Sequence, residues 1–277
     1  MRIEMYVILL ILFPKCLRCQ SVIQPHGTLI VAFICNNGII LAADSRASFT
    51  AYNDIVKREI PYAYVDSFRK IFTLGGFQIG ITGNENVGNI YWWDLVEKYN
   101  KTHKRDSSLK LTFLHFSKYL INDLKISDSL LRGNFFIVAG FEGNRPVITG
   151  INSIHSDTIF SVYNVGHRIA TNDCIKSKLA VNENYCTCDS IINLLVNGFT
   201  SCSQDWQLGI GGPLHIVRIN QGNHIVTIKS FKFIRFRTYT DFEKSIINKT
   251  TIVTHFFPEY TRDKLIEILK DNVLHHY

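Results

Sequence analysis

The chain of 277 residues is long enough for one large globular domain or two small ones, and its content of 46% hydrophobic and 19% charged residues excludes wholesale disorder. Lys and Arg number 30 against 23 Asp and Glu, but no run of five or more like charges occurs, so the sequence gives little support to a nucleic-acid partner. The seven cysteines fit neither a zinc-binding spacing nor a small disulfide scaffold. We therefore expect no metal and no cofactor.

The N-terminal segment contains an apolar run, YVILLILF at residues 6–13, behind a single early cation, Arg2. This run has the size of the core of a signal peptide and is too short to cross a bilayer. We expect residues 1–19 to be a signal peptide and the protein to be exported, either to a periplasm or out of the cell. The alternatives are that the run is a strand of a pro-segment or that the start is misassigned, in which case the protein is cytoplasmic. The mature protein is expected to have no membrane span.

The first half of the sequence predicts antiparallel strand pairs followed by two helices. Pro25-His26-Gly27 is interpreted as a turn, and residues 48–68 as a long polar excursion. Short apolar runs around Gly or Asn indicate hairpins, and apolar residues at helical spacing indicate amphipathic helices. Strands are predicted at 28–35, 39–43, 70–74 and 77–82, and helices at 86–99 and 108–124.

The second half repeats the order of strands, helices and strands. Strands are predicted at 134–139, 146–151 and 158–165, helices at 173–181 and 189–202, and a last hairpin at 214–219 and 224–230. Segregated helices and antiparallel strands predict a layered α+β domain with its sheets between helices, and argue against a doubly wound parallel sheet. The polar tail, residues 231–277, is expected to be a C-terminal extension with one helix at 261–273.

A set of polar and glycine residues follows the predicted strands in a recognisable order. Gly27-Thr28 opens the first strand, the second ends in AADSRA at residues 42–47, and Lys70 and Gly83 come next. In these residues the chain resembles the proteasome β-subunit family of N-terminal-nucleophile hydrolases. The resemblance covers about residues 27–230, and the domain is accordingly expected to span 28–230.

The resemblance implies a fold, an activity and partners. The fold is a four-layer α/β/β/α sandwich, in which two antiparallel sheets lie between helix layers. The activity is that of a threonine-type endopeptidase acting on peptides or unfolded proteins, and the protein is expected to form a homo-oligomer. Two alternatives stay open: a catalytically silent structural subunit of such an assembly, and an amidase for a small non-peptide substrate.

The expected chemistry centres on Thr28. A threonine hydroxyl needs a base, and a threonine at a chain start carries one in its α-amine, whose ordinary pKa is about 7.7 to 8.0. The ammonium of Lys70 would lower the pKa of that amine, and Asp44 would hold Lys70 charged and oriented. The backbone NH of Gly83 would stabilise the oxyanion. Because Thr28 is internal, the chain must first be cut, and attack of the Thr28 hydroxyl on the Gly27 carbonyl would release a pro-segment at residues 20–27.

Further positions are assigned with their alternatives. Ala47, Ser48, Phe68 and Ile81 match substrate-groove positions, and core packing explains them equally well. Lys57 competes with Lys70 for the catalytic role, because the segment before Lys70 is longer than is usual in the family.

Three residues are expected to contact and orient the catalytic groups without touching the substrate: Arg46, His167 and Asp205. Arg46 is interpreted as a structural ion-pair partner. His167 stands where the family has a small hydroxyl residue, and it either replaces that hydroxyl as a hydrogen-bond partner or is a turn histidine without a role. Gln207 and Ile210 stand where the family has Asp and Ser, with Asp205 two residues away, and these departures favour the alternative of a silent subunit.

Four of the cysteines are Cys174, Cys186, Cys188 and Cys202. They are expected to be free buried thiols, with oxidation outside the cytosol as the alternative.

Overall fold

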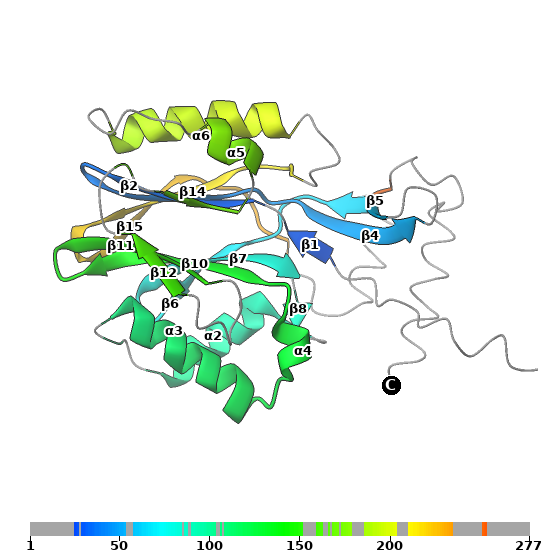
Figure 1. Ribbon diagram of the computed structural model, residues 1–277, viewed down its shortest axis with the longest axis horizontal. Coiled ribbons are helices and arrows are strands. Elements are labelled where there is room, and N and C mark those ends of the chain that lie inside the picture. The colour runs from blue at the N-terminus through cyan, green and yellow to red at the C-terminus, as the bar shows by residue number, and fades with distance from the viewer. Residues whose placement is uncertain are drawn as a thin grey trace, which may run out of the picture.

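The computed structural model of this protein describes residues 25–27, 29–53, 58–84, 86–87, 90–103, 106, 108–151, 159–162, 166, 168–171, 173–178, 186–203, 210–234 and 251–253. Two antiparallel sheets stack on each other, and helices cover the outer face of each (Figure 1). The predicted α+β class with antiparallel sheets is confirmed.

The smaller sheet has five strands and is built around a central hairpin. Its order is β13 (Arg168–Ala170), β2 (Ile30–Cys35), β3 (Gly38–Ala43), β14 (His215–Asn220) and β15 (His224–Lys229). Every residue of β2 and β3 is buried, because one face of the sheet meets the other sheet and the opposite face meets helices. That double burial explains why both strands are continuous apolar runs without alternation.

The larger sheet carries β1 (Pro25–Gly27) in its middle. Its order is β12 (Ile159–Val162), β11 (Arg145–Ile151), β10 (Phe135–Glu142), β7 (Phe77–Asn84), β1, β4 (Ala47–Asn53), β5 (Arg58–Val65) and β16 (Thr251–Val253), with β6 (Ile71–Leu74) also paired to β7. β4 and β5 extend beyond the helix layers on one side of the molecule (Figure 1).

The helices divide between the two outer faces. α2 (Trp92–Thr102) and α3 (Leu109–Lys118) lie against the larger sheet, and α5 (Asp173–Lys178) and α6 (Cys188–Cys202) lie against the smaller one (Figure 1). α3 begins where the Ser108 side chain accepts a hydrogen bond from the Leu111 NH, and it passes into a π-helical turn at Tyr119–Asp123. The short elements are α4 (Asp128–Leu131), β8 (Asn86–Val87), β9 (Ile90–Tyr91) and a 3-10 turn at Gln221–Asn223.

Three apolar clusters correspond to the three interfaces of this stack. Alternate residues of β2 separate cleanly: Ile30, Ala32 and Ile34 pack between the sheets, and Val31 and Phe33 pack toward α5 and α6. The third cluster joins the larger sheet to α2 and α3. The strand period of two therefore decides which core each side chain enters.

Three predictions of local structure are wrong. Pro25–Gly27 is a strand, because it finds partners on both sides, and residues 48–68 hold β4 and β5, whose alternation is obscured by a bulge at Phe49/Thr50. The helix predicted from Asn86 begins at Trp92, after the β8–β9 hairpin. The helix predicted at 261–273 lies outside the described residues.

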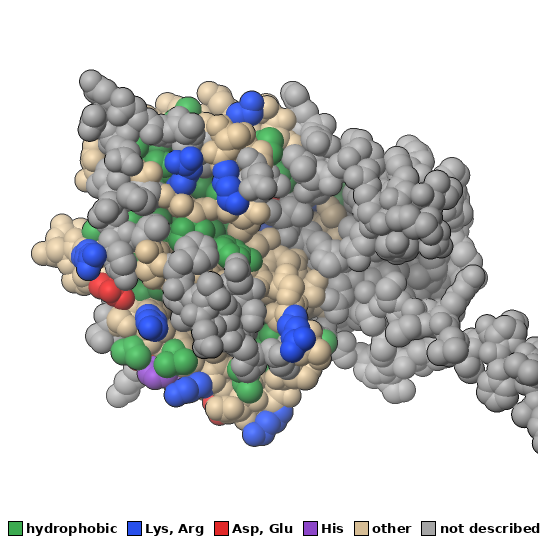
Figure 2. Space-filling view, viewed as in Figure 1, with side chains coloured by type: hydrophobic (Ala, Val, Ile, Leu, Met, Phe, Trp, Pro, Cys, Tyr) green, Lys and Arg blue, Asp and Glu red, His purple; other side chains and the backbone are tan. Residues whose placement is uncertain are grey.

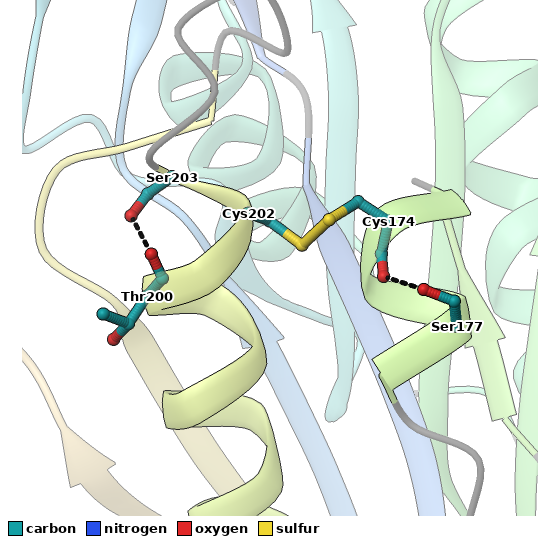
Figure 3. Close-up of a disulfide and its surroundings, with 5 residues drawn as sticks. All are labelled: Cys174, Ser177, Thr200, Cys202 and Ser203. Atoms are coloured by element: carbon teal, nitrogen blue, oxygen red, sulfur yellow. Dashed lines mark hydrogen bonds between the residues drawn. A yellow bond between two sulfur atoms is a disulfide. The ribbon is translucent and has the colours of Figure 1, made fainter.

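The expectation of four free thiols is also wrong for two of them. Cys174 of α5 and Cys202 of α6 form a disulfide that ties the two outer helices together (Figure 3). Cys35, Cys186 and Cys188 are buried thiols that form no disulfide. The sequence separation of 28 residues gave no hint of this pairing, which only the packing of α5 on α6 creates.

The charged side chains on the face drawn in Figure 2 form no strong patch. In the face drawn in Figure 2, Lys and Arg side chains are scattered rather than gathered. Within the described ranges, no helix is long and apolar enough to cross a membrane. The same part of the chain contains no cluster of three or more side chains suited to a metal ion.

Candidate active site

Asp44 lies directly after β3, at the end of a wholly apolar strand, and its side chain is fully buried. Its Oδ1 accepts hydrogen bonds from the Leu29 NH at 3.2 Å and from the Lys70 ammonium at 2.6 Å. Its Oδ2 accepts from the NH groups of Arg46 at 3.3 Å and Gly211 at 3.1 Å. Four donors thus converge on one buried carboxylate, which fixes its position in the fold.

Lys70 is the buried cation that faces Asp44. Its side chain is also inaccessible to solvent, and Nζ donates to Asp44 Oδ1 and to the Arg46 carbonyl, each at 2.6 Å. These two bonds leave one NH of the ammonium outside them. Lys57, the competing lysine, lies outside the described residues.

The electrostatics of the pair combine burial with compensation. Burial raises the pKa of the Asp44 carboxyl, and the charge and hydrogen bond of Lys70 oppose that rise, as do the NH groups of Gly211 and Leu29. A buried pair of this kind stores no large stability, but loss of one partner leaves an isolated charge in the interior.

Arg46 continues the chain beyond Asp44 and faces the other way. Its guanidinium forms a two-point ion pair with Asp66, with Nε to Oδ1 at 2.8 Å and Nη2 to Oδ2 at 3.1 Å, and it lies over the Tyr64 ring at 3.7 Å. Gly211 passes directly beneath it, since a Cβ there would be 2.3 Å from Arg46 Cζ. Arg46 thus braces the loop of Asp44 against the end of β5.

Gly83 stands on β7 opposite Gly27 of β1. Its φ of +104° favours glycine, and an added Cβ would lie 2.3 Å from the Gly133 carbonyl oxygen. His26 of β1 pairs with Ser48 on one side and with Asn84 on the other. The three residues before Thr28 are therefore held as a strand between β4 and β7.

Thr28 itself lies outside the described residues, but both of its sequence neighbours are described. Gly27 pairs with Gly83, and Leu29 exchanges hydrogen bonds with Asp44, because the Leu29 NH donates to Oδ1 and the Asp44 NH donates to the Leu29 carbonyl at 3.2 Å. The chain on either side of Thr28 is therefore anchored to the residues that the sequence singled out.

The four residues matched to a substrate groove have different surroundings. Ala47 and Ser48 open β4 beside β1, and both are buried. Phe68 donates its NH to the Ser45 carbonyl at 2.9 Å. Ile81 packs in the core under α2 and α3, and its NH donates to the Lys70 carbonyl at 3.0 Å. Core packing accounts for the Ile81 side chain.

Two residues that were expected to support the catalytic groups lie outside the described residues, and two residues that the sequence did not indicate bind Arg46 and Asp44. His167 and Asp205 lie outside the described residues, as does Gln207. Asp66 and Gly211 complete the surroundings of Arg46 and Asp44. The adjacent glycines at 211 and 212 were a signal for a close approach of backbone to side chains, whereas nothing in the sequence marked Asp66.

Comparisons with known proteins identify structures and no sequence family. No family profile and no curated protein matches this chain. A Gly-1 mutant of Anbu from Hyphomicrobium sp. strain MC1 has a TM-score of 0.49 and 16% identity, over 73% of this chain and 88% of that chain. Anbu (ancestral beta-subunit) from Yersinia bercovieri has a TM-score of 0.48 and 14% identity, over 73% of this chain and 87% of that chain. A structure of the helical assembly of the Anbu complex from Pseudomonas aeruginosa has a TM-score of 0.47 and 14% identity, over 80% of this chain and 96% of that chain.

These findings correct the family assignment made from the sequence. The structures that this chain resembles are Anbu proteins at 14–16% identity, and their TM-scores below 0.5 carry no argument about function. The assignment to the proteasome β-subunit family of N-terminal-nucleophile hydrolases is therefore wrong, because no family profile matches and the similar structures do not confirm that fold.

Proposed function

We propose that this protein is a hydrolase that uses the Thr28 hydroxyl as its nucleophile, first on its own Gly27–Thr28 bond and then on peptide bonds. The observation that carries the proposal is the anchoring of both neighbours of Thr28. Gly27 pairs with Gly83, and Leu29 exchanges hydrogen bonds with Asp44, which is itself paired with Lys70.

The first reaction is cleavage of the chain by itself. The Thr28 oxygen attacks the Gly27 carbonyl carbon, the Gly27–Thr28 amide bond breaks, the hydroxyl proton passes to the leaving nitrogen, and the acyl group stays on the oxygen as an ester. Water then hydrolyses that ester, which leaves Gly27 with a carboxylate and Thr28 with a free α-amine. The amine becomes the base for later rounds, since it can take the proton of the adjacent hydroxyl.

The buried ion pair supplies the electrostatic setting. A positive charge on Lys70 stabilises the deprotonated hydroxyl and lowers the pKa of a neighbouring amine, and Asp44 keeps that charge in place through a 2.6 Å contact. The Gly83 NH is proposed as the donor to the developing oxyanion. Its positive φ supports a role that needs close approach of backbone to a substrate carbonyl.

The substrate is proposed to be an extended peptide that pairs between Ala47-Ser48 and Gly83. β1 occupies that position, with His26 paired to Ser48 and to Asn84. An intact pro-segment therefore blocks the place that a substrate strand needs, and peptide hydrolysis has to follow its release. The larger frame of the proposal is a four-layer α/β/β/α arrangement, supported by the three apolar interfaces.

Export and self-association complete the proposal. The Cys174–Cys202 disulfide supports an oxidising compartment, where such bonds persist. Among the described strands, β15 lies at the edge of the smaller sheet with every residue exposed, and Ile225, Val226 and Ile228 are 40–44% exposed. An apolar strand edge of this kind supports pairing with a second copy.

The deciding experiment is intact-mass analysis and N-terminal sequencing of the purified full chain, its Thr28→Ala variant and its Thr28→Ser variant. We expect the wild-type and Thr28→Ser chains to begin at residue 28, because both keep a hydroxyl, and the Thr28→Ala chain to keep its Gly27–Thr28 bond. Cleavage of Thr28→Ala at the same bond would contradict the proposal. A wild-type chain that stays intact would favour the alternative of a silent structural subunit.

A further inference from the structure

The residues just after the last hairpin return to the candidate site. The Ile234 NH donates to the Ser67 carbonyl at 2.8 Å, and Ile234 pairs in parallel with Phe68. We call residues 231–234 the strap. It reaches the segment that leads into Lys70, although more than 160 residues of sequence separate the two.

The strap holds a backbone that is otherwise unfavourable. Ser67 has a φ of +80°, which residues with a side chain rarely adopt. Its NH donates to the Ser45 side chain at 3.3 Å, and its carbonyl accepts the bond from Ile234. A conformation of this kind persists only when its surroundings fix it, and the strap provides one of the two bonds that do so.

The strap also encloses the side chain next to Lys70. The Arg69 guanidinium lies over the rings of Phe233 at 5.5 Å, Trp93 at 5.0 Å and Phe72 at 5.3 Å. Arg69 Nε donates to the Ile71 carbonyl at 2.8 Å. The neighbours of Lys70 on both sides are therefore tied to one aromatic cluster in which the strap contributes Phe233.

Further contacts hold the strap itself in place. The Phe233 ring lies 5.0 Å from His215 and 4.7 Å from Phe231, in edge-to-face arrangements. Beyond the strap, β16 pairs with β5, with Thr251 opposite Val65. The C-terminal extension thus contacts both ends of the segment between β5 and Lys70.

We propose that the strap is a positioning element for Lys70, acting through Phe233 and Arg69. This inference rests on the proposed function, in which the ammonium of Lys70 must face both Asp44 and Thr28. The position of an ammonium on a flexible four-carbon stem depends on the backbone that carries it. The strap fixes the backbone before Lys70, and the Arg69 side chain bridges across Lys70 to the Ile71 carbonyl. Phe233 and Arg69 touch no substrate in this scheme, and they act only through Lys70.

The test measures the rate of Gly27–Thr28 cleavage in the full chain as a function of pH. Phe233→Ala should slow cleavage about 10-fold, because the cation–ring contact that locks Arg69 is lost. The midpoint of its pH–rate profile should shift to higher pH, since a displaced ammonium stabilises the deprotonated nucleophile less. Phe233→Tyr keeps a ring and should restore both rate and midpoint, whereas Phe233→Leu should not. Lys232→Ala, at an exposed side chain of the strap, is the matched control and should behave as wild type.

Hydrogen exchange gives a readout that does not depend on cleavage. The Ile81 NH donates to the Lys70 carbonyl, so it should exchange faster in Phe233→Ala and at the wild-type rate in Lys232→Ala.

The outcomes separate this inference from the proposed function. If Thr28→Ala blocks cleavage but Phe233→Ala leaves rate, midpoint and exchange unchanged, the positioning role is refuted and the nucleophile stands. A slower rate with an unmoved midpoint and no rescue by Phe233→Tyr would show general destabilisation and would equally refute it. Cleavage of the Thr28→Ala chain would refute the proposed function and, with it, this role.

Discussion

Replacing Lys70 by methionine tests the buried ion pair directly. The substitution is best made in a Thr28→Ala chain, so that self-cleavage does not alter the protein during measurement. Methionine fills the volume of the lysine stem and removes only the ammonium, so the cavity left behind is small. The variant leaves the Asp44 carboxylate, whose side chain is fully buried, with three backbone NH donors and no hydrogen-bonded countercharge.

The expected loss of stability follows from those contacts. Lys70 donates two bonds at 2.6 Å, to Asp44 and to the Arg46 carbonyl, and hydrogen bonds that involve a charge contribute about 1.5 to 3 kcal/mol each. Removing one partner of a buried ion pair costs about 3 to 5 kcal/mol, which agrees with the sum of the two bonds. We therefore expect Lys70→Met to lower the free energy of unfolding by about 3 to 5 kcal/mol at pH 7. We therefore expect a Lys70 variant to lose stability as well as activity.

Urea denaturation followed by tryptophan fluorescence measures this loss. Without Lys70, the pKa of Asp44 rises further above its unfolded value, so the folded state takes up a proton more readily and the penalty shrinks as pH is lowered through that pKa. Adding Asp44→Asn removes the orphaned charge and should recover about 2 kcal/mol in a double-mutant cycle. A Lys70→Met chain within about 1 kcal/mol of its parent, with no coupling to Asp44→Asn, would refute the reasoning.

Three further predictions concern other parts of the fold. Gly83→Ala should lower the free energy of unfolding by about 1 to 3 kcal/mol and block self-cleavage, because its φ is +104° and an added Cβ would lie 2.3 Å from a backbone carbonyl oxygen. Thermal unfolding and intact mass measure the two effects, and Gly143→Ala, which has a positive φ but open space around it, is the control. Reduction of Cys174–Cys202 should lower stability by at most about 3 to 4 kcal/mol, and dithiothreitol should leave the melting temperature of Cys202→Ser unchanged; an equal shift in both would contradict this. Burial and the nearby Arg69 lower the pKa of His215 to about 4, so the unfolded chain binds a proton at a higher pH than the folded chain. The free energy of unfolding should therefore fall by about 3 kcal/mol in total as the pH drops from about 6.5 to 4, and His215→Asn should flatten that dependence in urea denaturation.

Much of the secondary structure was determined by local sequence. Each of β2, β3, α3 and α6 buries a face against a neighbouring element. Their sequences therefore carry a clear signal, which is an apolar run in the two strands and apolar residues at helical spacing in the two helices. Asp44 and Lys70 were singled out by their place in the order Gly-Thr, AADSRA, Lys and Gly, through the resemblance to a known family, and the structure pairs them. The residues therefore indicated a site before any fold was known.

Only tertiary structure decided what those elements pair with. Pro25–Gly27 has the composition of a turn, yet it is a strand because β4 and β7 offer it partners on both sides. Ser48 and the residues after it have the composition of a loop, yet they form β4, because they pair with β5 across a register shift opposite Phe49 and Thr50. In both cases the stabilising hydrogen bonds come from residues far along the chain, which no local pattern contains.

The same reason explains the contacts around the site that were missed. Asp66, Gly211, the strap and the Cys174–Cys202 bond are defined by which segments meet after folding. The order of motifs in the sequence predicted, through that resemblance, that Asp44 and Lys70 pair near the Gly-Thr junction, and the structure shows that the pair is buried. The contact of the distant strap with the residues just before Lys70 depends on long-range packing, because its energy lies in contacts between residues that the sequence keeps apart.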